Sequence, residues 1–132
     1  MDLPITSALA GFAAIFLVLL SLPIALRRRA TKLSAGDGGD EAFNRKIRAQ
    51  ANFIEYVPLA IIAIGLLEMG GAGQPMLCGL AATLAAARLL HAFGLWSGVL
   101  IGRALGAMLT FAVLLVAGGL LLVGQFCPGC FG

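Results

Sequence analysis

The sequence predicts an all-α protein that crosses a membrane four times as a helical bundle. Of its 132 residues, 61% are hydrophobic and 11% are charged, and the mean hydropathy is +1.02. A soluble domain carries about 25% charged residues, so this chain could not cover a surface that faces water. Four apolar stretches of spanning length account for most of the chain, which leaves room for one domain, residues 1–132.

The first span is expected at residues 4–26, and it ends at a basic run that begins with the arginines at 27–29. Because the positive charges follow the apolar stretch, the pattern is not that of a secretory signal peptide. A polar link rich in glycine and aspartate comes next. Either Asp40 or Asn44 could cap the helix that follows it.

The second span is expected at residues 43–69. At about 1.5 Å per residue this helix exceeds the hydrocarbon layer, which is roughly 30 Å thick, so its first turns should project from the membrane. Pro58 removes one backbone hydrogen bond and favours a kink. The glycine-rich segment 70–75 predicts a turn, and the remaining spans are expected at 76–95 and 104–125.

The three cysteines do not predict a metal site. Cys78 lies within the third span, where packing is its expected role. Cys127 and Cys130 form a C-x-x-C pair near the carboxyl end. No second ligand pair and no thioredoxin-like pattern accompany that pair, so a structural role is favoured over a redox or metal-binding one.

The basic residues predict the orientation of the chain. Seven of the nine Lys and Arg residues lie between Arg27 and Arg48, and the link at 70–75 has none. The positive-inside rule then puts the first link in the cytoplasm and both termini outside. The basic run lies between two apolar spans with little aromatic interleaving, which argues against a nucleic-acid partner and favours contact with lipid headgroups.

A polar stripe runs into the second span. On a helix, one narrow arc carries Arg45, Arg48, Asn52, Glu55 and Tyr56. Each ionisable group at membrane depth costs about 3 kcal/mol or more, so the stripe favours a functional site. The alternative is that Arg48 and Glu55 pair with each other or with a neighbouring helix.

The order of the spans brings more polar groups to the same membrane edge. Arg88 and His91 lie one turn apart in the third span, and Arg28 and Arg103 lie at the ends of the first and fourth. For His91, ligand contact and a buried structural hydrogen bond are both open. Arginines bind carboxylates or phosphates, and they lower the pKa of a nearby thiol because thiolate is the charged form. We therefore expect a small anionic zwitterion or a thiol as the ligand.

The segment from Arg45 to Pro58 resembles the signature of the membrane-associated proteins in eicosanoid and glutathione metabolism, the MAPEG family. The signature is met throughout by Arg45, Arg48, Ala49, Asn52, Glu55, Tyr56 and Pro58. The spacing of Arg88 and His91, with a Gly-Arg pair before the fourth span, is similar to the family's third-helix pattern.

The resemblance implies a homotrimer of four-helix bundles that binds glutathione, as cosubstrate, between subunits near the cytoplasmic face. Position by position, it implies that glutathione is held by Arg28, Arg48, Asn52, Glu55, Tyr56, Arg88 and His91. It implies that Gln50, which points nearly opposite to the polar stripe, faces a neighbouring subunit, and that Arg103 is the catalytic residue that stabilises the thiolate.

The implied activity is that of a glutathione transferase whose lipophilic substrate enters from the bilayer. Two departures concern the catalytic step: Leu95 replaces a tyrosine of the eicosanoid enzymes, and Ala104 replaces a serine of one branch. The alternatives are a non-catalytic protein of the same fold that binds lipid or thiol, and a small transporter subunit, although the two halves share no inverted pattern. The short links are typical of a compact bacterial member, which implies the inner membrane.

Overall fold

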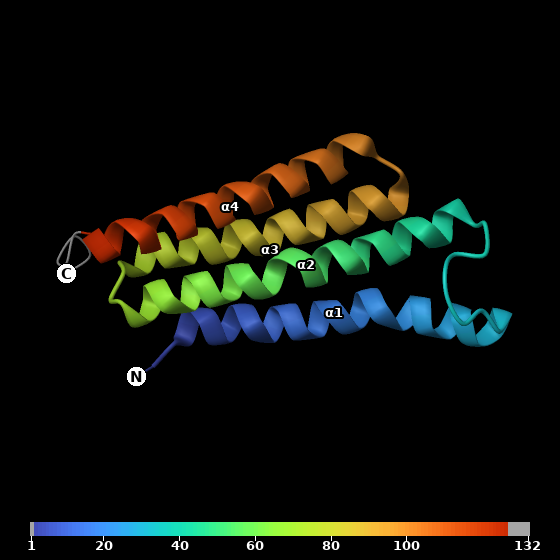
Figure 1. Cartoon of the computed structure of the whole chain (residues 1–132), viewed down its shortest axis with the longest axis horizontal. Helices are drawn as coiled ribbons and strands as arrows, with labels where there is room; N and C mark the ends of the chain where they lie inside the picture. Colours follow the sequence, from blue (N-terminus) through green and yellow to red (C-terminus); the bar gives the residue numbers. More distant parts are fainter. Residues whose placement is uncertain (1, 127–132) are drawn as a thin grey trace.

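The computed structural model describes residues 2–126 as four helices that run up and down in one bundle (Figure 1). The helices are α1 (Pro4–Thr31), α2 (Glu41–Met69), α3 (Gln74–Ser97) and α4 (Leu100–Phe126). Each is long and apolar enough to cross a membrane. The prediction of an all-α protein with four spans is confirmed, whereas the trimer stays a prediction. Cys127 and Cys130 lie outside the described residues.

The helices extend beyond the apolar stretches that predicted them. The basic run stays helical, so α1 continues to Thr31 and ends where Lys32 takes a left-handed backbone conformation. Arginine is a good helix former, and charged groups are free to continue a helix once it has left the membrane. The link between α3 and α4 shrinks to Gly98 and Val99, and Gly98 supplies the positive φ that the sharp turn requires.

Asp40 caps α2. Its backbone is extended, and its carboxylate accepts a hydrogen bond of 2.9 Å from the backbone N–H of Phe43. The same carboxylate pairs with Arg27 at the end of α1. The structure therefore selects Asp40 over Asn44 as the cap, and the cap also ties the first link to α1.

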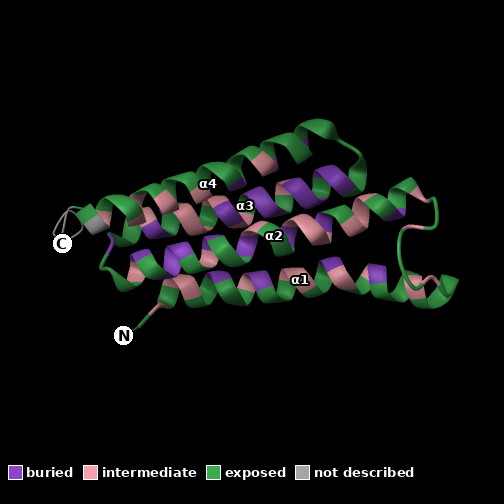
Figure 2. Cartoon of the chain, viewed as in Figure 1, coloured by how far each residue is buried: buried purple, intermediate pink, exposed green. Residues whose placement is uncertain are grey.

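Helices α2 and α3 form the centre of the bundle. Helix α2 contacts all three other helices, α3 also contacts α1 and α4, and α1 and α4 do not touch within the described residues. Figure 2 shows the buried positions concentrated on the inner faces of α2 and α3. The outer faces carry exposed large apolar side chains such as Val18 and Leu115, which suits a surface in contact with lipid.

Glycines allow α3 and α4 to approach unusually closely at the end with the short link. A Cβ on Gly106 would lie 2.6 Å from the backbone N of His91, and one on Gly94 would lie 2.2 Å from the backbone N of Arg103. Gly102 lies in the same crossing, one turn before Gly106. Small residues four apart are a common device for close packing of membrane helices. Here they bring His91 and the start of α4 together.

At the opposite end, Glu68 of α2 caps α1. Its carboxylate accepts hydrogen bonds from the backbone N–H groups of Ile5, at 3.0 Å, and Thr6, at 2.8 Å. The hydroxyl of Thr6 donates to it as well, at 2.6 Å. The first N–H groups of a helix lack partners within the helix, and a carboxylate also suits the positive end of the helix dipole. Glu68 thus anchors the amino-terminal turn of α1.

Candidate functional site

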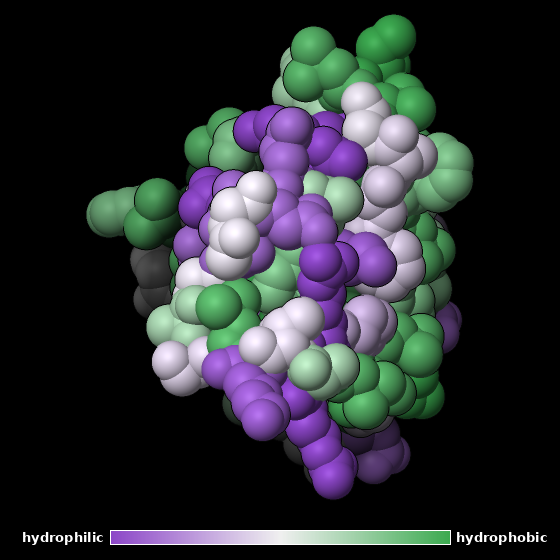
Figure 3. All heavy atoms as spheres, turned by 90° about the vertical axis from the view of Figure 1, so that its right-hand side faces the viewer, coloured by the Kyte–Doolittle hydropathy of each residue, from purple (hydrophilic) through white to green (hydrophobic). Residues whose placement is uncertain are grey.

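A polar pocket of about 230 Å³ opens at the end of the bundle that carries the α1–α2 and α3–α4 links. Figure 3 faces this end, where hydrophilic side chains gather in the middle and hydrophobic ones surround much of the edge. The residues that line the pocket come from α2, α3 and α4, and they are Glu41, Asn44, Arg45, Arg48, Asn52, His91, Leu95 and Arg103. Four predicted site residues, Arg48, Asn52, His91 and Arg103, are therefore brought together.

The fold explains why these side chains meet. Arg48 and Asn52 lie one turn apart on α2, and His91 and Leu95 lie one turn apart on α3, so each helix presents one face to the pocket. Arg103 lies in the first turn of α4, and the close approach at Gly94 fixes its backbone against α3. The pocket walls thus come from helices whose spacing is fixed by packing.

The pocket has a net positive charge. Glu41, its only acid, pairs with Arg45 one turn further along α2, at 2.9 Å, and the carboxylate is largely exposed. Neither Arg48 nor Arg103 forms an ion pair within residues 2–126. Two guanidinium groups are therefore free to receive carboxylate, phosphate or thiolate groups of a ligand.

Arg88 lies beneath the pocket and does not line it. Its side chain is only 1% exposed, and it donates hydrogen bonds to Thr110 Oγ1, at 3.2 Å, and to His91 Nδ1, at 3.1 Å. Its guanidinium lies 5.9 Å from the centre of the Phe53 ring. Arg88 Nε is buried without a partner, and no carboxylate within the described residues pairs with this charge.

The remaining predicted site residues lie outside the pocket of the single chain. Arg28 is half-buried at the end of α1, and Glu55 is exposed on α2. Tyr56 packs edge-on against Phe111 of α4, with 5.3 Å between ring centres. Gln50 donates a hydrogen bond of 2.7 Å to Ser21 of α1 in the same chain. Arg48 and Glu55 form no ion pair with each other within the described residues. Contacts of these side chains with glutathione or a neighbouring subunit stay predictions.

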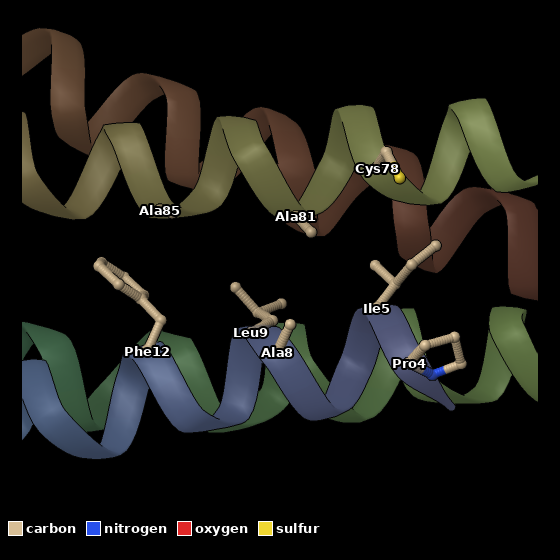
Figure 4. Close-up of a pocket in the computed structure, with 8 residues that line it drawn as sticks. All are labelled: Pro4, Ile5, Ala8, Leu9, Phe12, Cys78, Ala81 and Ala85. Carbon is tan, nitrogen blue, oxygen red and sulfur yellow. The ribbon is translucent and has the colours of Figure 1, made fainter. Parts of the chain in front are cut away.

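A second, larger cavity is an apolar groove of about 450 Å³ between α1 and α3 at the opposite end. Figure 4 shows small and apolar side chains of the two helices facing one another across it. Its lining is Pro4, Ile5, Ala8, Leu9, Phe12, Cys78, Ala81 and Ala85. Cys78 is exposed here, so the packing role expected for it is not seen within the described part of the single chain. The groove offers no charged group to bind a polar ligand.

Sequence reasoning missed one residue of the Arg88 network, Thr110. It is fully buried, accepts from Arg88 and donates to the carbonyl of Gly106, at 2.8 Å. A regular spacing could have revealed it, because Gly102, Gly106 and Thr110 recur every four residues along one face of α4. Thr110 is also the only hydroxyl residue of that span.

Four apolar helices with a basic pocket at one end define an integral membrane protein that has a small polar site. A model of the MAPEG family matches residues 6–123. The chain is also 31% identical over 114 residues to the inner membrane protein YecN of two Escherichia coli strains, a match that covers 85% of this chain and 86% of YecN. This protein therefore belongs to the MAPEG family.

Proposed function

We propose that this protein binds glutathione in the polar pocket and transfers it to lipophilic electrophiles. The observation that carries the proposal is the convergence of Arg48, Asn52, His91 and Arg103 on one cavity at one end of the bundle. Glutathione is a zwitterion of net negative charge that carries a thiol. Free guanidinium groups suit its carboxylates, and the same positive charge favours the thiolate form of its sulfur.

We further propose a homotrimer in which a neighbouring subunit completes the site. The pocket of one chain, about 230 Å³, is smaller than a typical ligand site of roughly 300–1,000 Å³. Glu55 is exposed at the midpoint of the 29-residue helix α2, about 21 Å from either end. Exposure of this carboxylate to lipid would cost about 3 kcal/mol or more. A second copy that covers this face of α2 and supplies a polar partner for the carboxylate would remove that cost and provide the missing wall.

In the proposed reaction, Arg103 stabilises the thiolate at the mouth of the pocket. The thiol releases its proton to water. The sulfur then attacks an electrophilic carbon of a substrate that arrives from the bilayer, a carbon–sulfur bond forms, and the leaving group departs with its electron pair. The α3–α4 crossing fixes the backbone of Arg103 beside the pocket before the substrate arrives, and a charge placed in advance is what electrostatic stabilisation of the thiolate requires.

The proposed location is the inner membrane, with the pocket on the cytoplasmic side and both termini outside. The basic run around the first link supports the orientation, and the relative named as an inner membrane protein supports the location. Glutathione is a cytoplasmic thiol, so a site at this face would have access to it.

The test is saturable binding of labelled glutathione to the purified protein in detergent. Loss of one charged hydrogen-bonding partner should weaken binding about 10- to 100-fold, so the dissociation constant should rise by that factor in Arg48→Ala. Arg29→Ala is the matched control, because Arg29 is exposed near the end of α1 and does not line the pocket. The absence of saturable binding, or an unchanged constant in Arg48→Ala, would contradict the proposal.

The second candidate is a non-catalytic protein that binds a thiol or lipid in the same fold. Leu95 favours this candidate, because it stands where the eicosanoid enzymes have a tyrosine. It lines the pocket with an apolar side chain, and no described residue that lines the pocket supplies a hydroxyl group in its place. An aryl halide assay separates the two. Conjugate formation above the rate without enzyme supports a transferase, whereas saturable glutathione binding without turnover supports the second candidate.

A further inference from the structure

The hydrogen bond between Arg88 and His91 determines which ring nitrogen of His91 carries the proton. Arg88 Nη2 lies 3.1 Å from His91 Nδ1. The arginine side chain has only donors and remains charged, so Nδ1 must act as the acceptor. A neutral imidazole whose Nδ1 is unprotonated carries its proton on Nε2. The imidazolium form would place two donors face to face at this contact.

The second ring nitrogen faces accessible space. His91 Nε2 has no hydrogen-bond partner within residues 2–126. It is also not one of the fully buried polar atoms that lack a partner, so part of its surface is accessible. His91 is 3% exposed and borders the polar pocket. The small surface that it retains therefore lies on the floor of the pocket, and an N–H group at Nε2 would be available to a ligand.

Arg88 is held in place from several directions. Thr110 accepts from its Nη1, at 3.2 Å, and donates in turn to the carbonyl of Gly106, at 2.8 Å. The centre of the Phe53 ring also lies near Arg88, 5.9 Å from the guanidinium carbon. Arg88 is only 1% exposed, so it does not contact a ligand in the pocket directly. It acts on the pocket through its hydrogen bond to His91.

The other charged groups that share the pocket with His91 reinforce this arrangement. Arg48 reaches it from α2 and Arg103 from α4, and Glu41, the pocket's only acid, is paired with Arg45. A second proton on His91 would add positive charge next to these arginines. The neutral ring with one outward donor is the form that fits all of its neighbours.

We propose that Arg88 is a positioning residue that fixes His91 as the Nε2–H tautomer, so that the pocket floor donates a hydrogen bond to an anionic atom of the ligand. His91 then acts as a donor and not as the base that removes the thiol proton. The nature of the ligand, a thiolate or carboxylate of glutathione, rests on the proposed function. The tautomer itself does not, because it is set by contacts within the ligand-free chain.

The experiment uses the only histidine of the sequence as its own probe. Nitrogen NMR of the full-length protein with ¹⁵N-labelled histidine, in detergent at neutral pH and without ligand, should give one pyrrole-like signal, at Nε2, and one pyridine-like signal, at Nδ1. A pyrrole-like Nδ1, or the signals of an imidazolium ring, would overturn the proposal. The wild-type spectrum alone decides this part.

Variants test the role of Arg88. In Arg88→Met the two tautomers should interconvert and their signals should move toward the average. Arg29→Met, which removes an exposed arginine outside the pocket, should match wild type. A folded Arg88→Met with the wild-type pattern would overturn the role. If that variant does not fold, magnetisation transfer between arginine guanidinium protons and the His91 ring nitrogens in wild type replaces it. The absence of transfer would show that Arg88 does not contact the His91 ring, which would overturn its role.

Addition of glutathione separates the two proposals. Binding should shift the Nε2 signal more than the Nδ1 signal, and saturable binding without a change at Nε2 would overturn the ligand contact. A confirmed tautomer without glutathione binding would instead leave this inference standing and contradict the proposed function.

Discussion

Polar side chains at the two ends of the bundle differ in whether they have partners within the chain. At the end near the α2–α3 turn, the Glu68 carboxylate receives three hydrogen bonds from Ile5 and Thr6. At the other end, Arg48 and Arg103 form no ion pair within the described residues and border an open pocket. Glu68 is satisfied within the described part of its own chain, and the two arginines are not.

This difference distinguishes structural from functional polar groups in a membrane protein. A carboxylate that caps a helix stabilises the fold and needs nothing else. Charged groups left open at membrane depth are expensive unless a ligand or another subunit compensates them. Substitution of Glu68 should therefore change stability alone, and substitution of Arg48 or Arg103 should change binding and turnover with less effect on stability.

The largest expected effect concerns Arg103. Arg103→Met should lower the rate of conjugation about 100-fold or more, which is the usual cost of losing one group that stabilises charge in a transition state. Stability should hardly change, because Arg103 is exposed and forms no ion pair within residues 2–126. Steady-state kinetics with an aryl halide, with Arg29→Met as control, measure the rate. If Arg103→Met lost stability together with activity, the proposed difference between the two ends would be wrong.

The next effect tests whether the pocket depends on the α3–α4 crossing. A Cβ on Gly106 would lie 2.6 Å from three atoms of Ala87 and His91, so Gly106→Ala should destabilise the fold by about 1–3 kcal/mol. Gly119→Ala is the matched control, because nothing lies within 4 Å of its Cβ position. Far-UV circular dichroism during denaturation in mixed detergent measures the difference. Equal stability of the two variants would contradict the conclusion that close packing of α3 and α4 depends on Gly106.

A smaller effect is expected at Glu68. Loss of this trans-acting cap in Glu68→Ala should lower stability by about 1–2 kcal/mol and should increase hydrogen exchange at the amides of Ile5 and Thr6. Glutathione binding should match wild type, because Glu68 lies at the opposite end of α2 from the pocket. Weaker binding in this variant would show that the two ends are coupled.

Sequence reasoning predicted the four spans and half of the candidate site because both follow from one-dimensional patterns. Membrane spans must be continuous and apolar, and a helical period of 3.6 residues places Arg48 and Asn52 on one face. The order of the spans then gives the depth of His91 and Arg103. These four residues meet in the pocket, as the shared depth and the helical face together predict.

The rest depended on contacts that no pattern within one helix contains. Glu68 and Thr6 are 62 residues apart, so the cap exists only once α1 and α2 have packed. Depth also placed Arg88 at the site, but the contact with Thr110 holds its side chain beneath His91. Among the glycines, the adjacent pair at 118 and 119 faces open space, whereas Gly102 and Gly106 form the crossing.

The smallest effect concerns the cap at the start of α2, where a satisfied carboxylate lies close to the open pocket. The backbone N–H of Phe43, and then Arg27, hold the pKa of Asp40 below its ordinary value of 3.8. A lowered pKa means that the ionised cap stabilises the folded state above the ordinary pKa, and that this contribution is lost as the pH falls through the lowered pKa.

Hydrogen-exchange protection at the Phe43 amide should therefore be constant at neutral pH and should fall only in strong acid. Asp40→Asn should keep most of the protection, since asparagine also caps helices, and should abolish its dependence on pH. Persistence of the acid transition in Asp40→Asn would assign it to another group. Glutathione binding should be unchanged in this variant, because Asp40 does not line the pocket. A loss of glutathione binding would mean that the first link also contributes to the binding site.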